Sequence, residues 1–104
     1  MPGVDFNLLR DQIQMQDVLN RLGFRPSRST GTQLRGPCPV HKSHSEHSRS
    51  FAVNLTQGRF YCHRCHIHGN VIELWAAVHQ QTLVQAAIDL CNSLGPEVPW
   101  IRRW

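Results

Sequence analysis

Four side chains with metal-binding donors stand in two short pairs near the middle of the chain. Cys38 and His41 lie three positions apart, and Cys62 and Cys65 repeat this spacing after an interval of twenty residues. A spacer of two residues lets the backbone turn beneath a metal ion, so both donors of a pair point the same way. Two such pairs on neighbouring turns suit tetrahedral Zn²⁺. Because all four positions are filled by protein donors, they predict one structural zinc ion rather than a catalytic one.

The alternatives to this ligand set are few. His44 and His47 could replace His41, although neither has the tight pair spacing with Cys38. An even number of cysteines could instead form disulfides, but six of the seven histidines share the central stretch with three of the four cysteines, and this favours metal. A zinc hydrolase or deaminase would need an open coordination position and a general-base glutamate beside the metal.

Basic residues are concentrated in the same part of the chain. The 104-residue sequence has a formal net charge of +4. Residues 25–68 hold seven basic side chains and a single acidic one, whereas the flanking segments are slightly acidic. Ten of the eleven basic residues are arginine, whose forked guanidinium suits phosphate. The central stretch is therefore expected to face nucleic acid, with an ordinary solvated surface as the alternative.

The amount of chain corresponds to a single domain, residues 1–104. Apolar residues at helical spacing predict a helical segment over 5–23, split into two short helices near Gln12–Gln14. Asp5 is expected to cap its start and Gly23 to end it.

A zinc ribbon is expected over residues 33–69. After loop-like residues from Arg25, a short strand is predicted near Gln33–Gly36, and strands over 50–55 and 59–62 form a hairpin. By alternation Phe51, Val53 and Leu55 share the inward face, and Tyr61 is the exposed member of the Phe60–Tyr61 pair.

Two further helices are predicted over residues 70–94. Asn70 caps the first, and Thr82 with Gln85 forms a capping box for the second. Trp75 is assigned to the core. The inner stripe of the last helix is predicted to consist of Leu83, Ala86, Ala87, Leu90, Cys91 and Leu94.

The combined motifs resemble the N-terminal zinc-binding domain of bacterial DnaG-type DNA primases. The resemblance lies in Cys38-Pro39-Val40-His41, Ser50-Phe51, Phe60-Tyr61-Cys62-His63-Arg64-Cys65 and His68-Gly69-Asn70-Val71-Ile72-Glu73. It implies an α+β zinc-ribbon fold, in which a small antiparallel β-sheet is packed by N- and C-terminal helices. It also implies zinc on Cys38, His41, Cys62 and Cys65, and binding of single-stranded template DNA in replication priming.

Contacts to DNA are expected from one aromatic and five cationic side chains of the central stretch. These are Arg35, Lys42, Arg49, Arg59, Tyr61 and Arg64. Aromatic rings stack on unpaired bases and cations neutralise phosphate.

The acidic residues are scattered singly, so we expect no polymerase site within this chain and no catalysis by it alone. Expected partners are DNA and a primase catalytic domain or helicase. The expected location is the cytoplasm of a bacterial-type cell, and no membrane is expected among the partners. The alternative function is a zinc-stabilised protein-interaction or regulatory module of a replication or mobile-element protein, suggested by Trp100, Trp104 and the Arg102-Arg103 tail.

Overall fold

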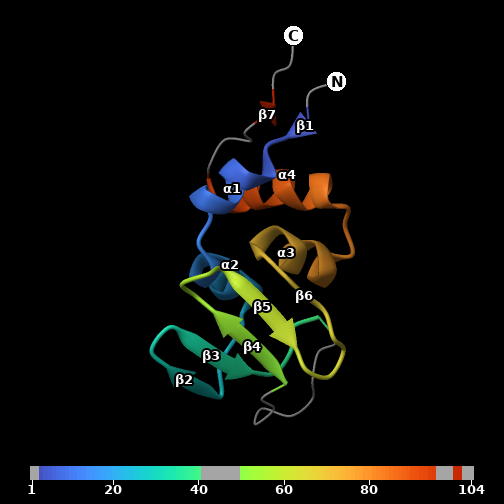
Figure 1. Ribbon diagram of the computed structural model, residues 1–104. Helices are drawn as coiled ribbons and strands as arrows, with labels where there is room; N and C mark the ends of the chain where they lie inside the picture. The colour runs from blue at the N-terminus through green and yellow to red at the C-terminus, as the bar shows by residue number, and fades with distance from the viewer. Residues whose placement is uncertain (1–2, 41–49, 96–99, 102–104) are drawn as a thin grey trace.

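The described residues form a five-stranded antiparallel sheet, a separate two-stranded antiparallel pair of terminal segments, and four helices. Figure 1 shows how these elements are arranged. The computed structural model describes residues 3–40, 50–95 and 100–101. The elements are β1 (Gly3–Val4), α1 (Phe6–Gln12), α2 (Met15–Leu22), β2 (Arg28–Thr30), β3 (Gln33–Gly36), β4 (Phe51–Asn54), β5 (Arg59–Cys62), β6 (His68–Gly69), α3 (Val71–His79), α4 (Leu83–Leu94) and β7 (Trp100–Ile101). This is the α+β arrangement that the sequence predicts.

The sheet is a simple meander in which β2 to β6 follow one another across it. Its side chains alternate between a buried and an open face, as the pleat of a strand requires. Phe51 and Val53 on β4 are buried, and on β5 Phe60 is buried while Tyr61 is exposed. The predicted inward and outward residues of the hairpin are therefore confirmed, although Leu55 is only partly buried.

The helix boundaries coincide with local capping signals. The Asp5 carboxylate accepts a hydrogen bond from the Leu8 N–H, and Gly23 ends α2 in the left-handed conformation. Asn70 caps α3, and Thr82 with Gln85 forms the capping box of α4. These predicted caps are confirmed, as is the break between α1 and α2.

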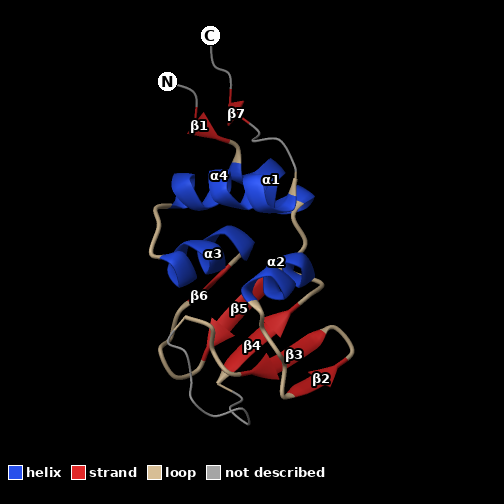
Figure 2. Ribbon diagram, turned by 180° about the vertical axis from the view of Figure 1, so that it is seen from behind, coloured by secondary structure: helices blue, strands red, loops and turns tan. Residues whose placement is uncertain are grey.

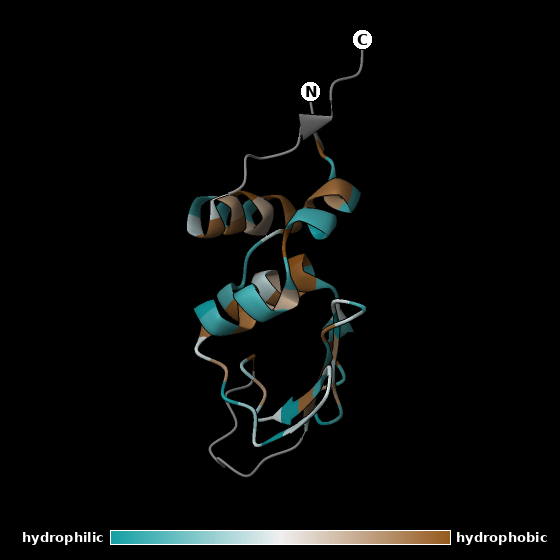
Figure 3. Ribbon diagram, turned by 90° about the vertical axis from the view of Figure 1, so that its left-hand side faces the viewer, coloured by the Kyte–Doolittle hydropathy of each residue, from teal (hydrophilic) through white to brown (hydrophobic). Residues whose placement is uncertain are grey.

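The helices form two layers on the buried side of the sheet. In Figure 2, α2 lies directly against the sheet, α3 continues beside β6, and α1 and α4 lie beyond α3. Each helix carries both hydrophobic and hydrophilic residues along its length (Figure 3), as amphipathic helices do. The two layers are joined by a hydrogen bond of 2.7 Å from the buried Trp75 indole N–H to Asp89 on α4.

Several details differ from the sequence prediction. Arg28–Thr30 forms β2 where a loop was expected. Hydrogen bonds to β3 stabilise this strand, whose own sequence has no strand pattern. The β1–β7 pair was not predicted either, since two-residue strands have no periodicity to detect. Leu83 is 47% exposed rather than buried, because it is the first residue of α4 and the buried stripe begins one turn later at Ala86. No helix in the described ranges has the length and apolar character needed to span a bilayer.

Candidate metal centre and exposed sheet face

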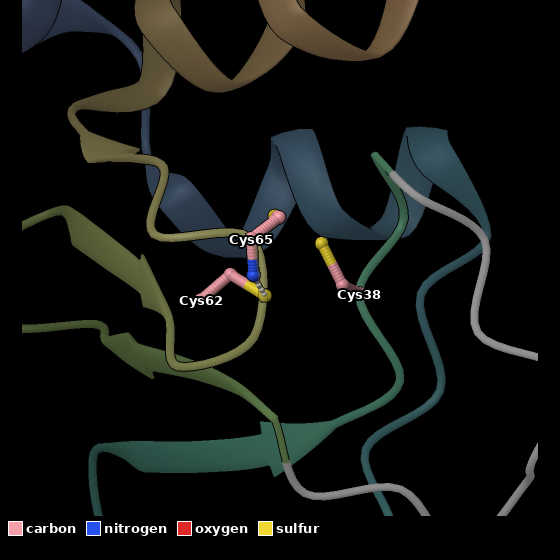
Figure 4. Close-up of side chains that lie close together, drawn as sticks. All are labelled: Cys38, Cys62 and Cys65. Atoms are coloured by element: carbon pink, nitrogen blue, oxygen red, sulfur yellow. Dashed lines mark hydrogen bonds between the residues drawn. The ribbon is translucent and has the colours of Figure 1, made fainter.

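Three cysteines from two distant segments meet at one end of the sheet (Figure 4). Cys38 follows β3, Cys62 is the last residue of β5, and Cys65 lies in the turn after it. Their sulfur atoms all lie within 4.8 Å of one another. Cys38 and Cys62 are buried, whereas Cys65 is exposed, and none forms a disulfide. The sheet therefore brings together three of the four predicted donors.

The turn between Cys62 and Cys65 is held by its own backbone. The Cys65 N–H donates to the Cys62 sulfur at 3.4 Å. His66 adopts a left-handed conformation, with φ of 63°, and its N–H donates to the Cys62 carbonyl at 2.8 Å. The His63 N–H donates to Ser50 at 2.7 Å and ties the turn to the segment before β4. These backbone hydrogen bonds therefore orient the sulfurs of Cys62 and Cys65.

The surroundings of Cys62 favour its thiolate. Burial alone raises the pKa of this thiol, because a charged sulfur loses its hydration. Hydrogen bonds from the backbone N–H groups of Cys65 and Arg64, together with those from the Cys65 and Cys38 side chains, outweigh burial, so the pKa lies below its ordinary value. A thiolate is the form that ligates metal.

The donor set fits zinc. Zinc–sulfur bonds of about 2.3 Å in a tetrahedron place the sulfurs roughly 3.8 Å apart, which is compatible with sulfurs that all lie within 4.8 Å of one another. Structural zinc takes four ligands, so one donor is needed beyond the three cysteines. The predicted fourth ligand His41, its alternatives His44 and His47, and the predicted DNA contacts Lys42 and Arg49 lie outside the described residues.

Two glycines next to the cysteine cluster permit close packing. A Cβ atom at Gly36 would come within 2.9 Å of the Phe24 ring, which packs edge-on against Phe51 beneath the sheet. A Cβ atom at Gly69 would come within 2.6 Å of Glu73, whose carboxylate accepts a hydrogen bond from the Asn70 N–H. The His68-Gly69-Asn70 motif therefore allows α3 to begin directly at the end of β6.

A row of side chains crosses the open face of the sheet from one edge to the other. The strand register pairs Arg28 with Arg35, Arg35 with Ala52, Ala52 with Tyr61, and Tyr61 with His68. Residues directly opposite each other in antiparallel strands share a face. The row therefore runs from two arginines, across a small alanine, to an aromatic ring and an imidazole.

A hollow of about 480 Å³ lies beside Ala52 on this face. Gln33, Asn54, Arg59 and Tyr61 are among its lining residues. The alanine side chain leaves this space open between the longer side chains of the neighbouring strands. The floor is the sheet itself, so the hollow is wide and shallow in form and suits a flat group.

Three imidazole rings surround Tyr61. Its hydroxyl shares a hydrogen bond of 3.2 Å with Nδ1 of His66. The ring centroids of His63 and His68 lie 4.7 Å and 6.2 Å from that of Tyr61, and the His68 ring is stacked on it. These contacts hold the tyrosine ring in one orientation while leaving it 37% exposed.

The structure sorts the described DNA-contact candidates into two groups. Arg35, Arg59 and Tyr61 lie on the open face of the sheet, whereas Arg64 is exposed in the turn between Cys62 and Cys65. Sequence reasoning missed Arg28 and His68 as members of the row. Neither could be placed there, because the strands that carry them were not predicted.

Comparisons with known proteins agree with this geometry. The chain matches the family model of the CHC2 zinc finger over residues 3–102. It is 31% identical over 84 residues to a DNA primase of Buchnera aphidicola subsp. Baizongia pistaciae, which covers 80% of this chain and 14% of the relative. It is 24% identical over 94 residues to a DNA primase of Haemophilus influenzae, which covers 89% of this chain and 15% of the relative.

A solved structure has the same fold. The crystal structure of the Aquifex aeolicus primase, which contains zinc-binding and RNA polymerase domains, superposes with a TM-score of 0.74 at 24% identity. The match covers 92% of this chain and 23% of the solved chain. This chain thus spans about a seventh of the length of the curated relatives.

The family match and the cysteine cluster together confirm the predicted structural zinc and the zinc-ribbon form of the α+β fold. Because the match extends over nearly all of the sequence and includes the three clustered cysteines, the chain belongs to the CHC2 zinc-finger family, the zinc-binding domain of DnaG-type DNA primases.

Proposed function

We propose that this chain is the template-binding module of a DNA primase, and that it holds single-stranded DNA on the open face of its zinc-stabilised sheet. The observation that carries the proposal is the exposed, oriented ring of Tyr61 beside a hollow rimmed by Arg59. The relatives named DNA primase support the role in priming.

The proposed zinc ligands are Cys38, Cys62 and Cys65, with His41 as the fourth and His44 or His47 as its alternatives. Zinc supplies a bond between the chain after β3 and the end of β5. Three thiolates on Zn²⁺ leave one negative charge, which the neighbouring Arg64 would offset. The ion thus maintains the register of the strands that carry the binding face, without taking part in chemistry.

The open face suits unpaired bases. The hollow beside Ala52 has room for a flat ring against Tyr61, and Gln33 and Asn54 offer amide groups to base edges. Paired bases within a duplex keep their faces stacked on one another and would not reach this ring. The face therefore selects single strands by stacking.

The arginines supply the second half of the interaction. Arg28 and Arg35 lie directly opposite each other on the open face. A phosphate placed between them would contact both guanidinium groups. Arg59, on β5, lines the hollow itself and adds a third cationic side chain to this face.

We also propose that residues 1–104 act as a single domain that does not polymerise nucleotides alone. The acidic residues that the structure describes are distributed over different elements, and none takes part in a cluster of three or more metal-binding groups. A catalytic domain or helicase of the same replication system would supply the chemistry and position the template.

The test is binding of the zinc-loaded chain to a labelled deoxythymidine oligonucleotide and to a duplex of equal length, measured by fluorescence anisotropy across a salt series. Contacts from the three arginines of the sheet predict that log K falls against log salt with a slope of about −2 for a short single strand that covers only this face. The duplex should bind more weakly. Absence of binding at low salt, or binding without a salt slope, would contradict the proposal.

A further inference from the structure

A second cleft, of about 680 Å³, lies where three parts of the fold meet. Its walls are the α1–α2 junction, the β4–β5 turn and the start of α3. Polar side chains dominate the lining. They are Arg10, Asp11, Gln14, Gln16, Thr56, Gln57, Arg59 and Asn70.

The cleft has a cationic character. Arg10 and Arg59 both line it, and within the described ranges neither forms an ion pair with a carboxylate. Arg10 donates to the neutral side-chain oxygen of Asn7 at 2.5 Å, which orients the guanidinium without neutralising it. Of the lining residues that the structure describes, Asp11 alone is acidic, so the two arginines outweigh it.

This cleft adjoins the hollow on the sheet face. Gln57 and Arg59 line both spaces, since the β4–β5 turn separates them. A single DNA strand that extends from the hollow across the β4–β5 turn would reach the cleft next. Because they share these residues, the two spaces could bind neighbouring parts of one extended ligand.

The lining suits a phosphate rather than a base. Among the described residues, no aromatic side chain lines the cleft, whereas Tyr61 lines the hollow. Two guanidinium groups and the amides of Gln14, Gln16 and Gln57 offer N–H donors, the groups that bind phosphate oxygens. Of the apolar lining residues, Ile13, Met15 and Val71 are buried and Leu55 is partly buried, so they form a floor and offer little surface to a ring.

We infer that the cleft between the α1–α2 junction and the β4–β5 turn binds a backbone phosphodiester of the same single strand whose base occupies the hollow beside Tyr61, with Arg10 as its contact. This inference rests on the proposed function. It lengthens the binding site beyond the ribbon and assigns a nucleic-acid contact to the N-terminal helical segment.

The experiment compares the zinc-loaded Arg10→Gln chain with Arg21→Gln, its matched control. Both arginines are exposed and lie in the last turn of a short helix, but Arg21 lines neither space. Affinity is measured for deoxythymidine oligonucleotides of increasing length and for ATP as a free phosphate ligand. Loss of one phosphate contact should weaken binding about fivefold at 0.1 M salt and reduce the salt slope by about 0.7. This effect should be confined to the longer oligonucleotides, while Arg21→Gln binds all of them as the unaltered chain does.

The outcomes separate this inference from the proposed function. Equal affinities for the two variants at every length would overturn the phosphate site, even if Tyr61→Ala still weakens binding of the shortest oligonucleotide. A loss of ATP binding with no effect on oligonucleotides would also overturn it, because the cleft would then hold a free nucleotide. Failure of the unaltered chain to bind any oligonucleotide would instead refute the proposed function beneath it.

Discussion

Tyr61 stands at the centre of the open sheet face, with Ala52 opposite it on β4 and His68 on β6. Its ring is held by its neighbours, so little side-chain entropy is lost when a base stacks on it. The hydroxyl contact to His66 orients the ring, whereas the ring face provides the stacking surface.

Replacing Tyr61 by alanine should weaken single-stranded DNA binding by about 1–3 kcal/mol, roughly fivefold to 150-fold, because the stacking surface is removed. Tyr61→Phe, the matched control, keeps the ring and should retain most of the affinity. Fluorescence anisotropy of the zinc-loaded variants measures both. If alanine and phenylalanine have the same effect, the hydroxyl network rather than stacking is responsible.

For single residues, the sequence predicted which side chains bind metal or are exposed better than it predicted which residues lie beside them. The spacing of Cys38, Cys62 and Cys65 was enough to predict that they share one site, because closely spaced pairs of metal donors have few alternative geometries. Alternation within the hairpin predicted the exposure of Tyr61. The position of Arg28 opposite Arg35 depends on strand pairing, which no local pattern records.

Among the described elements, α3 follows β6 at a closely packed junction. It begins one residue after β6, and its Asn70–Glu73 capping box leaves no room for a side chain at Gly69, whose φ is +150°. The junction connects the ribbon to the helical layer, so its geometry controls how the two parts meet.

Gly69→Ala should lower the free energy of unfolding by about 2–4 kcal/mol, because a Cβ there strains the backbone and displaces Glu73. Gly31→Ala is the control, since Gly31 also has a positive φ but open space around it, and it should cost about 1 kcal/mol. Urea unfolding of the zinc-loaded chains gives both values. The double variant Gly69→Ala, Glu73→Ala should recover part of the loss. Equal losses for the two glycine variants would show that the contact with Glu73 is unimportant.

Elements with local start and stop signals were predictable, whereas elements defined by a partner were not. Asp5, Gly23, Asn70 and Thr82 mark the helices because a cap is a contact between near neighbours in the sequence. The short strands β1, β2, β6 and β7 exist because a neighbouring strand satisfies their backbone. The exposure of Leu83 follows from its place as the first residue of α4, one turn before the buried stripe begins at Ala86.

The whole molecule consists of a metal-dependent ribbon and a helical layer with its own apolar contacts. In the ribbon, β3 and β5 each pair with β4, and the cysteine cluster adds a direct connection between the segment after β3 and the end of β5. The two layers of helices, in contrast, are held together by the packing of α3 against α4 and by the Trp75–Asp89 hydrogen bond. Removal of zinc should therefore affect the two parts unequally.

Chelation should make the Cys38, Cys62 and Cys65 thiols reactive while Cys91 stays protected. Cys91 is buried on α4, and this burial raises the pKa of its thiol, so little thiolate is present at neutral pH. Alkylation followed by mass spectrometry distinguishes the four sites, and Cys91→Ser provides the control. Labelling of Cys91 as fast as the other three would show that the helical layer also requires zinc.

The most direct test of the zinc-stabilised ribbon is the metal content of the purified chain, measured by native mass spectrometry with elemental analysis. One zinc ion per chain is predicted for the unaltered protein and for Cys91→Ser, and none for Cys62→Ser. His41→Ala should also lose zinc, whereas His44→Ala and His47→Ala should keep it if His41 is the fourth ligand. A folded chain without zinc, or a Cys62→Ser chain that retains a full equivalent, would contradict the account.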